Sequence, residues 1–212
     1  MNTARAELRK LLTLPSLRWT AVLTWAGTAL LAYAYGVTQP RGDAAGLAPL
    51  GYAQAGFLVL GVLTAAAEYQ AGGQIRTTLI AMPRRLPLQG AKDLTLAAVT
   101  LPVAAATAAI STLPAGGGTW TPAATAYLTL TTLLAAAVTG IVRQALPGVV
   151  LLLGLYFIAG PLLRARYGAV AAYLPDTAAL DPARGAAATI TWTLAALVLA
   201  AVTFARRDAA QG

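Results

Sequence analysis

Few residues of this 212-residue chain could take part in chemistry. The sequence contains no cysteine and no histidine, which excludes thiolate chemistry, disulfides and most zinc sites. None of its acidic residues lies in the middle of an apolar run, where proton-coupled carriers often place a carboxylate. The phosphate-cradling pattern GxxxxGK[ST] is also missing from the sequence. We therefore expect neither an enzyme nor a bound cofactor or metal.

The densest group of polar and turn-forming residues is 68-EYQAGGQIRTTLIAMPRRLPLQGAKD-93. Within it, Ile75, Leu79 and Met82 recur at i, i+4 and i+7, which predicts one apolar face on a short helix over residues 74–82. Pro83 ends the pattern, and Arg84 follows it. Two interpretations are open: an interfacial helix whose arginines meet anionic lipid, or a docking helix for a soluble partner.

The chain as a whole is apolar, with 58% hydrophobic and 10% charged residues. Soluble domains contain about 25% charged residues, so this composition favours an all-α polytopic membrane protein. Six runs approach the ~20 apolar residues that a spanning helix needs. They cover residues 17–36, 50–67, 94–113, 122–142, 147–163 and 186–205, with boundaries marked by Pro49 and other Pro and Gly residues. The basic start of the first run also resembles a cleaved signal peptide, but five further runs favour a span.

Basic residues predict how the spans are oriented. With the N-terminus inside, the cytoplasmic segments contain eleven Lys and Arg residues and the outer segments contain four. This asymmetry predicts a cytoplasmic N- and C-terminus, and it attributes the net charge of +8 to topology rather than to nucleic-acid binding. We expect a single domain over 1–212, with an amphipathic N-terminal helix over 1–17, a cytoplasmic loop over 68–93 and an extracellular loop over 164–185.

Small residues are abundant in the predicted spans. Ala, Gly and Thr outnumber Leu and Ile there, which predicts close helix packing, and threonine hydroxyls can also bond across helices. Pro102 predicts a kink in the third span. Near the N-terminus, Leu8, Leu11 and Leu12 form an apolar stripe that predicts either a helix lying along the membrane or a simple basic anchor.

The segment 68–93 resembles the cytoplasmic loop of type-2 ABC transporter permeases of actinobacterial character. The shared pattern is a Glu-aromatic pair, a Gly-containing turn, Ile-Arg-Thr-Thr-Leu, a small apolar pair, Pro-Arg-Arg and Ala-Lys. The stretch 6-AELRKLLTLPSLRWT-20 is similar to the opening of the same family, and together these motifs cover about 40 residues. Gln70 stands where many members carry Arg, which puts the detailed loop contacts in doubt.

The resemblance implies the membrane subunit of an ATP-driven exporter in a bacterial plasma membrane. A separate ATPase subunit would bind the ATP, and a second permease copy, identical or related, would complete the assembly within the membrane lipids. Residues 74–82 would be the coupling helix in a groove of the ATPase. The residues that would serve this coupling are Glu68, Ile75, Arg76, Thr78, Leu79, Met82, Arg84 and Arg85. Glu68 and Arg76 would either pair with charges on the partner or brace the loop.

Other functions stay open alongside export of a hydrophobic compound, peptide or lipid. An ion-coupled carrier, a channel or a membrane scaffold is compatible with six spans, although the missing mid-span charge disfavours the first two. Several aromatic and amide side chains could line a pathway, but packing or an interfacial position is the more ordinary role for each. These residues are Tyr52, Gln54, Phe57, Tyr127, Tyr156 and Phe157.

Overall fold

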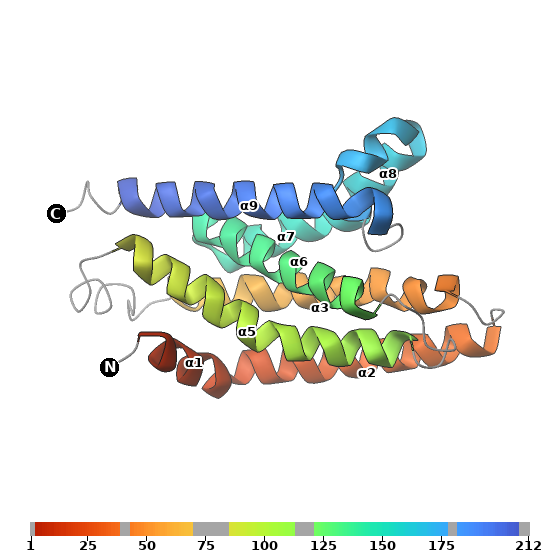
Figure 1. Cartoon of the computed structure of the whole chain (residues 1–212), viewed down its shortest axis with the longest axis horizontal. Coiled ribbons are helices and arrows are strands. Elements are labelled where there is room, and N and C mark those ends of the chain that lie inside the picture. The colour runs from red at the N-terminus through yellow and green to blue at the C-terminus, as the bar shows by residue number, and fades with distance from the viewer. Residues whose placement is uncertain (1–2, 39–42, 70–84, 113–120, 178–181, 208–212) are drawn as a thin grey trace.

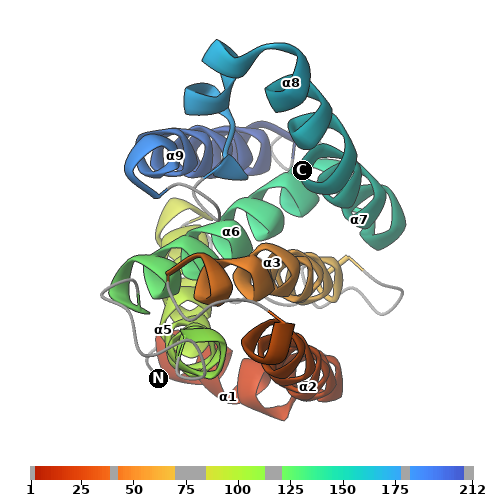
Figure 2. The ribbon, with the colours of Figure 1, turned by 90° about the vertical axis from the view of Figure 1, so that its right-hand side faces the viewer.

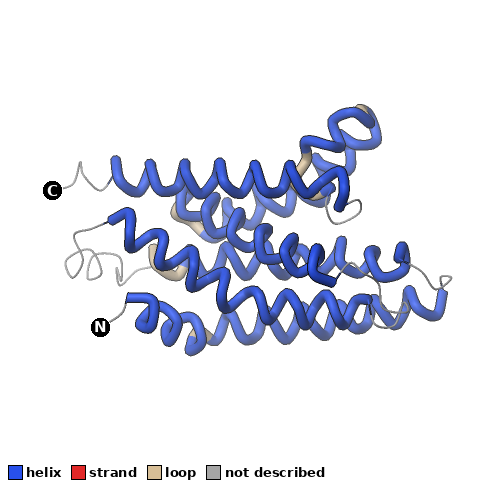
Figure 3. Tube along the Cα trace, viewed as in Figure 1, coloured by secondary structure: helices blue, strands red, loops and turns tan. Residues whose placement is uncertain are grey.

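The computed structural model describes residues 3–38, 43–69, 85–112, 121–177 and 182–207. Every regular element in these ranges is a helix, as Figures 1 and 3 show. The elements are α1 (Thr3–Thr13), α2 (Pro15–Thr38), α3 (Asp43–Ala66), α5 (Arg85–Thr112), α6 (Thr121–Val142), α7 (Ala145–Gly154), the π-helical turn η2 (Leu155–Ala159), α8 (Gly160–Arg166), the 3₁₀ helix η3 (Gly168–Tyr173) and α9 (Pro182–Arg207). The all-α prediction is confirmed.

Six helical segments are long and apolar enough to cross a membrane. They cover Pro15–Thr38, Ala48–Ala66, Leu88–Thr112, Pro122–Val142, Ala145–Arg166 and Gly185–Phe204. Each contains one of the six runs predicted from the sequence, apart from a single residue at the C-terminal end of three runs. The fifth span, which looks short in the sequence, is 22 residues long because α7, η2 and α8 continue one another.

The spans run back and forth, so both described ends of the chain lie at the same end of the bundle (Figure 1). We call this the terminal end; it also contains the end of α3, the start of α5 and the turn between α6 and α7. The opposite end, which includes α8 and η3, is the distal end. An even number of antiparallel spans produces this arrangement.

The centre of the bundle is formed by α3 and α6, which pack against each other and touch most of the remaining spans (Figure 2). About half of each is buried, 56% and 50%, against 22% for α2 and 28% for α9. Their close approach depends on Gly61, because a Cβ there would overlap the Thr132 carbonyl and lie 2.8 Å from Ala135 Cβ. The outer spans expose large apolar side chains instead, which suits contact with lipid.

Threonine hydroxyls in the described ranges bond mainly within their own helix. Most of them donate to a carbonyl of the preceding turn; examples are Thr64, Thr100, Thr107, Thr131, Thr132 and Thr139 at 2.7–3.0 Å. Bonds to another segment also occur: Thr189 donates to the Pro175 carbonyl at 2.9 Å, and Thr193 of α9 donates to the Leu130 carbonyl of α6 at 3.4 Å. A helical threonine reaches its own i−4 carbonyl with no help from a neighbour.

Two prolines lie inside helices. Pro49 does not mark a boundary, because α3 already begins at Asp43 and continues through it. Pro49 is the seventh residue of α3, past the first turn, so it removes one i→i−4 hydrogen bond from the helix. Pro102 lies within α5, whose direction changes partway along its length in Figure 1. This bend agrees with the predicted kink.

The fifth span contains a wider turn that the sequence analysis did not anticipate. The N–H of Gly160 donates to the Leu155 carbonyl, five residues back, which defines the π-helical turn η2. Pro161 follows directly. It has no N–H, and its ring would clash with the carbonyl four residues earlier in a regular α-helix. The π turn provides room for this ring.

The N-terminal segment forms a helix of its own, α1, which is separated from α2 at Leu14. Of the predicted apolar stripe, Leu11 is buried against Leu17 and Leu96, whereas Leu8 and Leu12 are exposed. Since α1 also packs along α5, it is part of the bundle at the terminal end.

Candidate functional site

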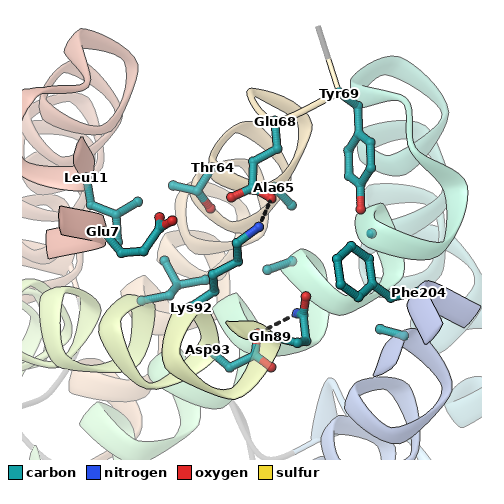
Figure 4. A pocket seen from close by; sticks show the side chains of 14 residues that line it. Glu7, Leu11, Thr64, Ala65, Glu68, Tyr69, Gln89, Lys92, Asp93 and Phe204 are labelled. Atoms are coloured by element: carbon teal, nitrogen blue, oxygen red, sulfur yellow. Dashed lines mark hydrogen bonds and ion pairs between the residues drawn. The ribbon is translucent and has the colours of Figure 1, made fainter. Parts of the chain in front are cut away.

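The candidate site begins at the end of α3. After Ala66 the chain makes a tight turn in which the N–H groups of Glu68 and Tyr69 donate to the carbonyls of Ala65 and Ala66 at 3.2 and 3.0 Å. The turn directs the Glu68 side chain toward α1 and α5 (Figure 4). Glu68 is thus the last described acidic residue before the segment predicted to couple to an ATPase.

Glu68 joins two other helices through its two carboxylate oxygens. Oε1 accepts from Lys10 Nζ of α1 at 3.1 Å, and Oε2 accepts from Lys92 Nζ of α5 at 2.6 Å. The Glu68, Lys10 and Lys92 side chains are only 15%, 26% and 12% exposed. We call these three residues the Glu68 clamp. Because each oxygen has its own ammonium partner, the clamp ties α1, α3 and α5 together at the terminal end.

Further polar groups surround the clamp (Figure 4). Glu7 approaches Lys10 at 3.7 Å, and Gln89 Nε2 donates to Asp93 Oδ1 at 3.1 Å. Lys92 Nζ also lies 5.9 Å from the centre of the Phe204 ring, which brings α9 into the cluster. Cations at this distance from an aromatic face are attracted to it. Side chains from four helices therefore meet at the base of the loop that follows α3.

Arg143 adds a contact from α6. It ends that helix with φ 61°, and its N–H donates to the Thr139 carbonyl at 2.6 Å. A left-handed residue often closes a helix, but glycine is the usual occupant and a side chain there carries strain. The Arg143 guanidinium lies 5.4 Å from the centre of the Tyr69 ring. The side chain next to Glu68 is therefore held against α6.

The space enclosed by this cluster is small. It measures about 60 Å³, which suffices for a few waters but not for a transported molecule. Among the residues that the structure describes, no three metal-ligating side chains gather at one place. The cluster therefore joins helix ends through side-chain contacts and encloses little space.

The structure describes few of the predicted coupling residues. Ile75, Arg76, Thr78, Leu79, Met82 and Arg84 lie outside the described residues, and Arg85 is the first residue of α5, with a side chain that is not described. Glu68 is the exception, and its ion pairs are made within the chain. Of the two roles expected for it, these contacts are of the bracing kind.

The sequence analysis did not identify the partners of Glu68. Lys10 and Lys92 were counted only as cytoplasmic charges, and Tyr69 and Arg143 were not connected. A signal does exist: Glu68 is an acidic residue directly after an apolar run, at the membrane side where lysines precede or follow other runs. An acid in that position needs a basic partner from a neighbouring helix end.

The predicted pathway residues lie elsewhere, toward the distal end. The Tyr127 hydroxyl donates to Gln54 Oε1 in a buried hydrogen bond between α6 and α3, and Phe57 packs in the same core. Tyr52, Gln54, Tyr156 and Phe157 line a common cavity. Spacing in the sequence does not reveal this gathering, because it depends on how α3 and the fifth span pack.

The chain matches no protein-family model, no curated protein and no solved structure.

Proposed function

We propose that this chain is the membrane-spanning subunit of an ATP-driven exporter, coupled to a separate ATPase through the segment between α3 and α5. Six apolar spans with both termini at one end support a permease. The excess of basic residues on that end supports its placement in the cytoplasm. The sequence itself lacks a phosphate-cradling loop, so the energy would come from a partner.

The observation that carries the proposal is the Glu68 clamp. A coupling loop must transmit force to the spans rather than swing loosely, and the clamp fixes the start of this loop to α1 and α5. Tyr69 against Arg143 adds α6. Closure of an ATPase dimer would push the loop, and the push would reach four helices at once, tilting the bundle between inward- and outward-facing states.

The docking helix over 74–82 would present Ile75, Leu79 and Met82 to a groove on the ATPase. Two permease copies, identical or related, would engage two ATPase subunits. A hydrophobic compound, peptide or lipid is the expected cargo class, moved out of the cell.

Co-purification tests this proposal. The neighbouring reading frame is expected to encode an ATPase with a phosphate-binding loop, and the two proteins are co-expressed with a tag on the permease. Leu79→Asp and Arg76→Glu should each release the ATPase. Leu146→Asp is the matched control, because Leu146 is a leucine, 76% exposed, in the first turn of α7 at the terminal end.

Retention of the ATPase by both loop variants would remove this loop from the interface. Release by Leu146→Asp as well would show a general loss of folding rather than a loss of docking. Flux into vesicles without ATP would favour the carrier or channel alternative, and absence of any flux or ATPase partner would favour a scaffold.

A further inference from the structure

A second hollow lies at the distal end, far from the Glu68 clamp. It is a cavity of about 320 Å³ between α2, α3 and the fifth span. Its walls contain four aromatic rings, those of Tyr35, Tyr52, Tyr156 and Phe157. Tyr156 and Phe157 belong to the π turn η2. The local widening that accommodates Pro161 therefore also shapes the wall of this cavity.

An ion pair lies at one side of the cavity. Arg164 of α8 donates to Asp176, which follows η3, and both residues line the space. The Asp176 carboxylate sits against Gly160, where an added Cβ would come within 2.7 Å of its Cγ. Asp176 is only 3% exposed at its side chain, whereas Arg164 is 19% exposed. The charged group that a ligand can reach is therefore the guanidinium.

Hydrogen-bond donors outnumber acceptors around the cavity. A guanidinium has five N–H donors, and the one bond reported for Arg164 within the described ranges goes to Asp176. The Gln54 carbonyl oxygen is already occupied by the Tyr127 hydroxyl, which leaves its amide nitrogen as a donor. The Tyr156 hydroxyl is fully buried beside Thr131 of α6, which does not line the cavity, so only the ring of Tyr156 contributes to the wall.

We propose that this distal cavity binds an amphipathic molecule with an anionic, oxygen-rich head and an apolar tail. The phosphate or carboxylate oxygens of the head accept from the Arg164 guanidinium, and the tail lies against the four rings. Arginine also matches the planar arrangement of phosphate and carboxylate oxygens.

Two sources share this chemistry: a phospholipid of the surrounding membrane and a single-chain amphiphile passing through. Binding at this cavity does not depend on an ATPase, and it goes beyond the proposed function. Its failure would leave the coupling proposal untouched, and the reverse also holds.

The experiment uses the full chain in a neutral detergent, with binding followed by native mass spectrometry. The probes are dodecyl phosphate, dodecanol, inorganic phosphate and phosphatidylglycerol. Dodecyl phosphate should bind at least about tenfold more tightly than dodecanol or inorganic phosphate, because it supplies both the head and the tail. Equal binding of dodecanol would overturn the role of the donors, and equal competition by inorganic phosphate would overturn the role of the tail.

Variants distinguish binding at this cavity from nonspecific binding. Tyr52→Ala should weaken dodecyl phosphate binding about fivefold to tenfold, because it removes one of the rings against which the tail lies. The matched control is Tyr33→Ala, which removes the ring of a tyrosine that is 71% exposed and does not line the cavity, and should change nothing. The double variant Arg164→Gln/Asp176→Asn removes the guanidinium without leaving a lone buried charge, and should abolish the preference for dodecyl phosphate over dodecanol.

Each variant is first checked for an unchanged melting profile. If the double variant fails this check, Phe157→Trp replaces it, since a larger ring fills the tail space and should weaken binding of dodecyl phosphate in the same way. Wild-type affinity in Tyr52→Ala together with either of these variants would refute the proposal. Phosphatidylglycerol that co-purifies and resists exchange identifies a lipid site, whereas ready displacement by dodecyl phosphate identifies a site for single-chain amphiphiles.

Discussion

The Glu68 clamp makes a quantitative prediction for Glu68→Gln. This change keeps the shape of the side chain but removes the charge that two lysines share, at 3.1 and 2.6 Å. Exposed ion pairs contribute about 0.2–1 kcal/mol, and loss of one partner from a fully buried pair costs about 3–5 kcal/mol. With side chains 12–26% exposed, the clamp lies between these limits, so we expect a loss of about 2–3 kcal/mol.

The two lysines should contribute unequally. Lys92 is closer to Glu68 and less exposed than Lys10, so Lys92→Met should cost more than Lys10→Met. For a chain of this size, 1 kcal/mol corresponds to about 2–4 °C in melting temperature. Glu68→Gln should therefore lower the melting temperature in detergent by roughly 5–10 °C. Tryptophan fluorescence measures this melting.

A double-mutant cycle isolates the pair energies. The coupling of Glu68 with Lys92 should exceed its coupling with Lys10. Glu7→Gln is the control, because Glu7 belongs to the same cluster but approaches Lys10 only at 3.7 Å, and it should have little effect. If Glu68→Gln melts within 1–2 °C of the wild type, or Lys10 proves the stronger partner, the clamp does not hold the helix ends as we argue.

Three further changes test other parts of the structure, each by melting temperature. Gly61→Ala places a Cβ 2.8 Å from Ala135 Cβ and against a backbone carbonyl, so it should cost about 2–3 kcal/mol, whereas Gly27→Ala, with nothing within 4 Å, should be neutral or slightly stabilising. Gly160→Ala would press on the Asp176 carboxylate and should cost about 1–3 kcal/mol; a loss no larger than that of Gly27→Ala would contradict this contact. Burial raises the pKa of Asp176 above its ordinary 3.8, against the hydrogen bond and charge of Arg164, so the folded protein holds this proton more tightly than the unfolded chain. The stabilisation from this bound proton is complete below pH 3.8 and is lost as the pH rises through the raised pKa. The stability of the wild type relative to Asp176→Asn should therefore fall over this window. A stability difference that does not change with pH would contradict the shift.

Much of the fold follows from composition and run length. The six apolar runs predict the six spans because a long apolar segment has few alternatives to a membrane helix. Positions of helix ends are less predictable. Pro49 looks like a boundary, yet α3 begins six residues before it and continues through it, with the loss of one backbone hydrogen bond.

The sites depend on contacts between segments far apart in the chain. Glu68 and Lys10 are 58 residues apart, and only the packing of α1 beside α5 brings them together. The distal cavity similarly requires the π turn, which arises from the geometry before Pro161 and has no periodic signal. Residue types indicated which side chains were candidates, but not which would meet.

The threonine hydroxyls have a consequence for how the bundle can move. Because nearly all of them are satisfied within their own helix, the faces between spans are smooth with respect to hydrogen bonding. Neighbouring spans could then slide or roll past each other while breaking few directional bonds, and the resistance would come mainly from shape. A hydroxyl that is bonded within its own helix therefore adds no directional bond that would resist relative motion of the spans.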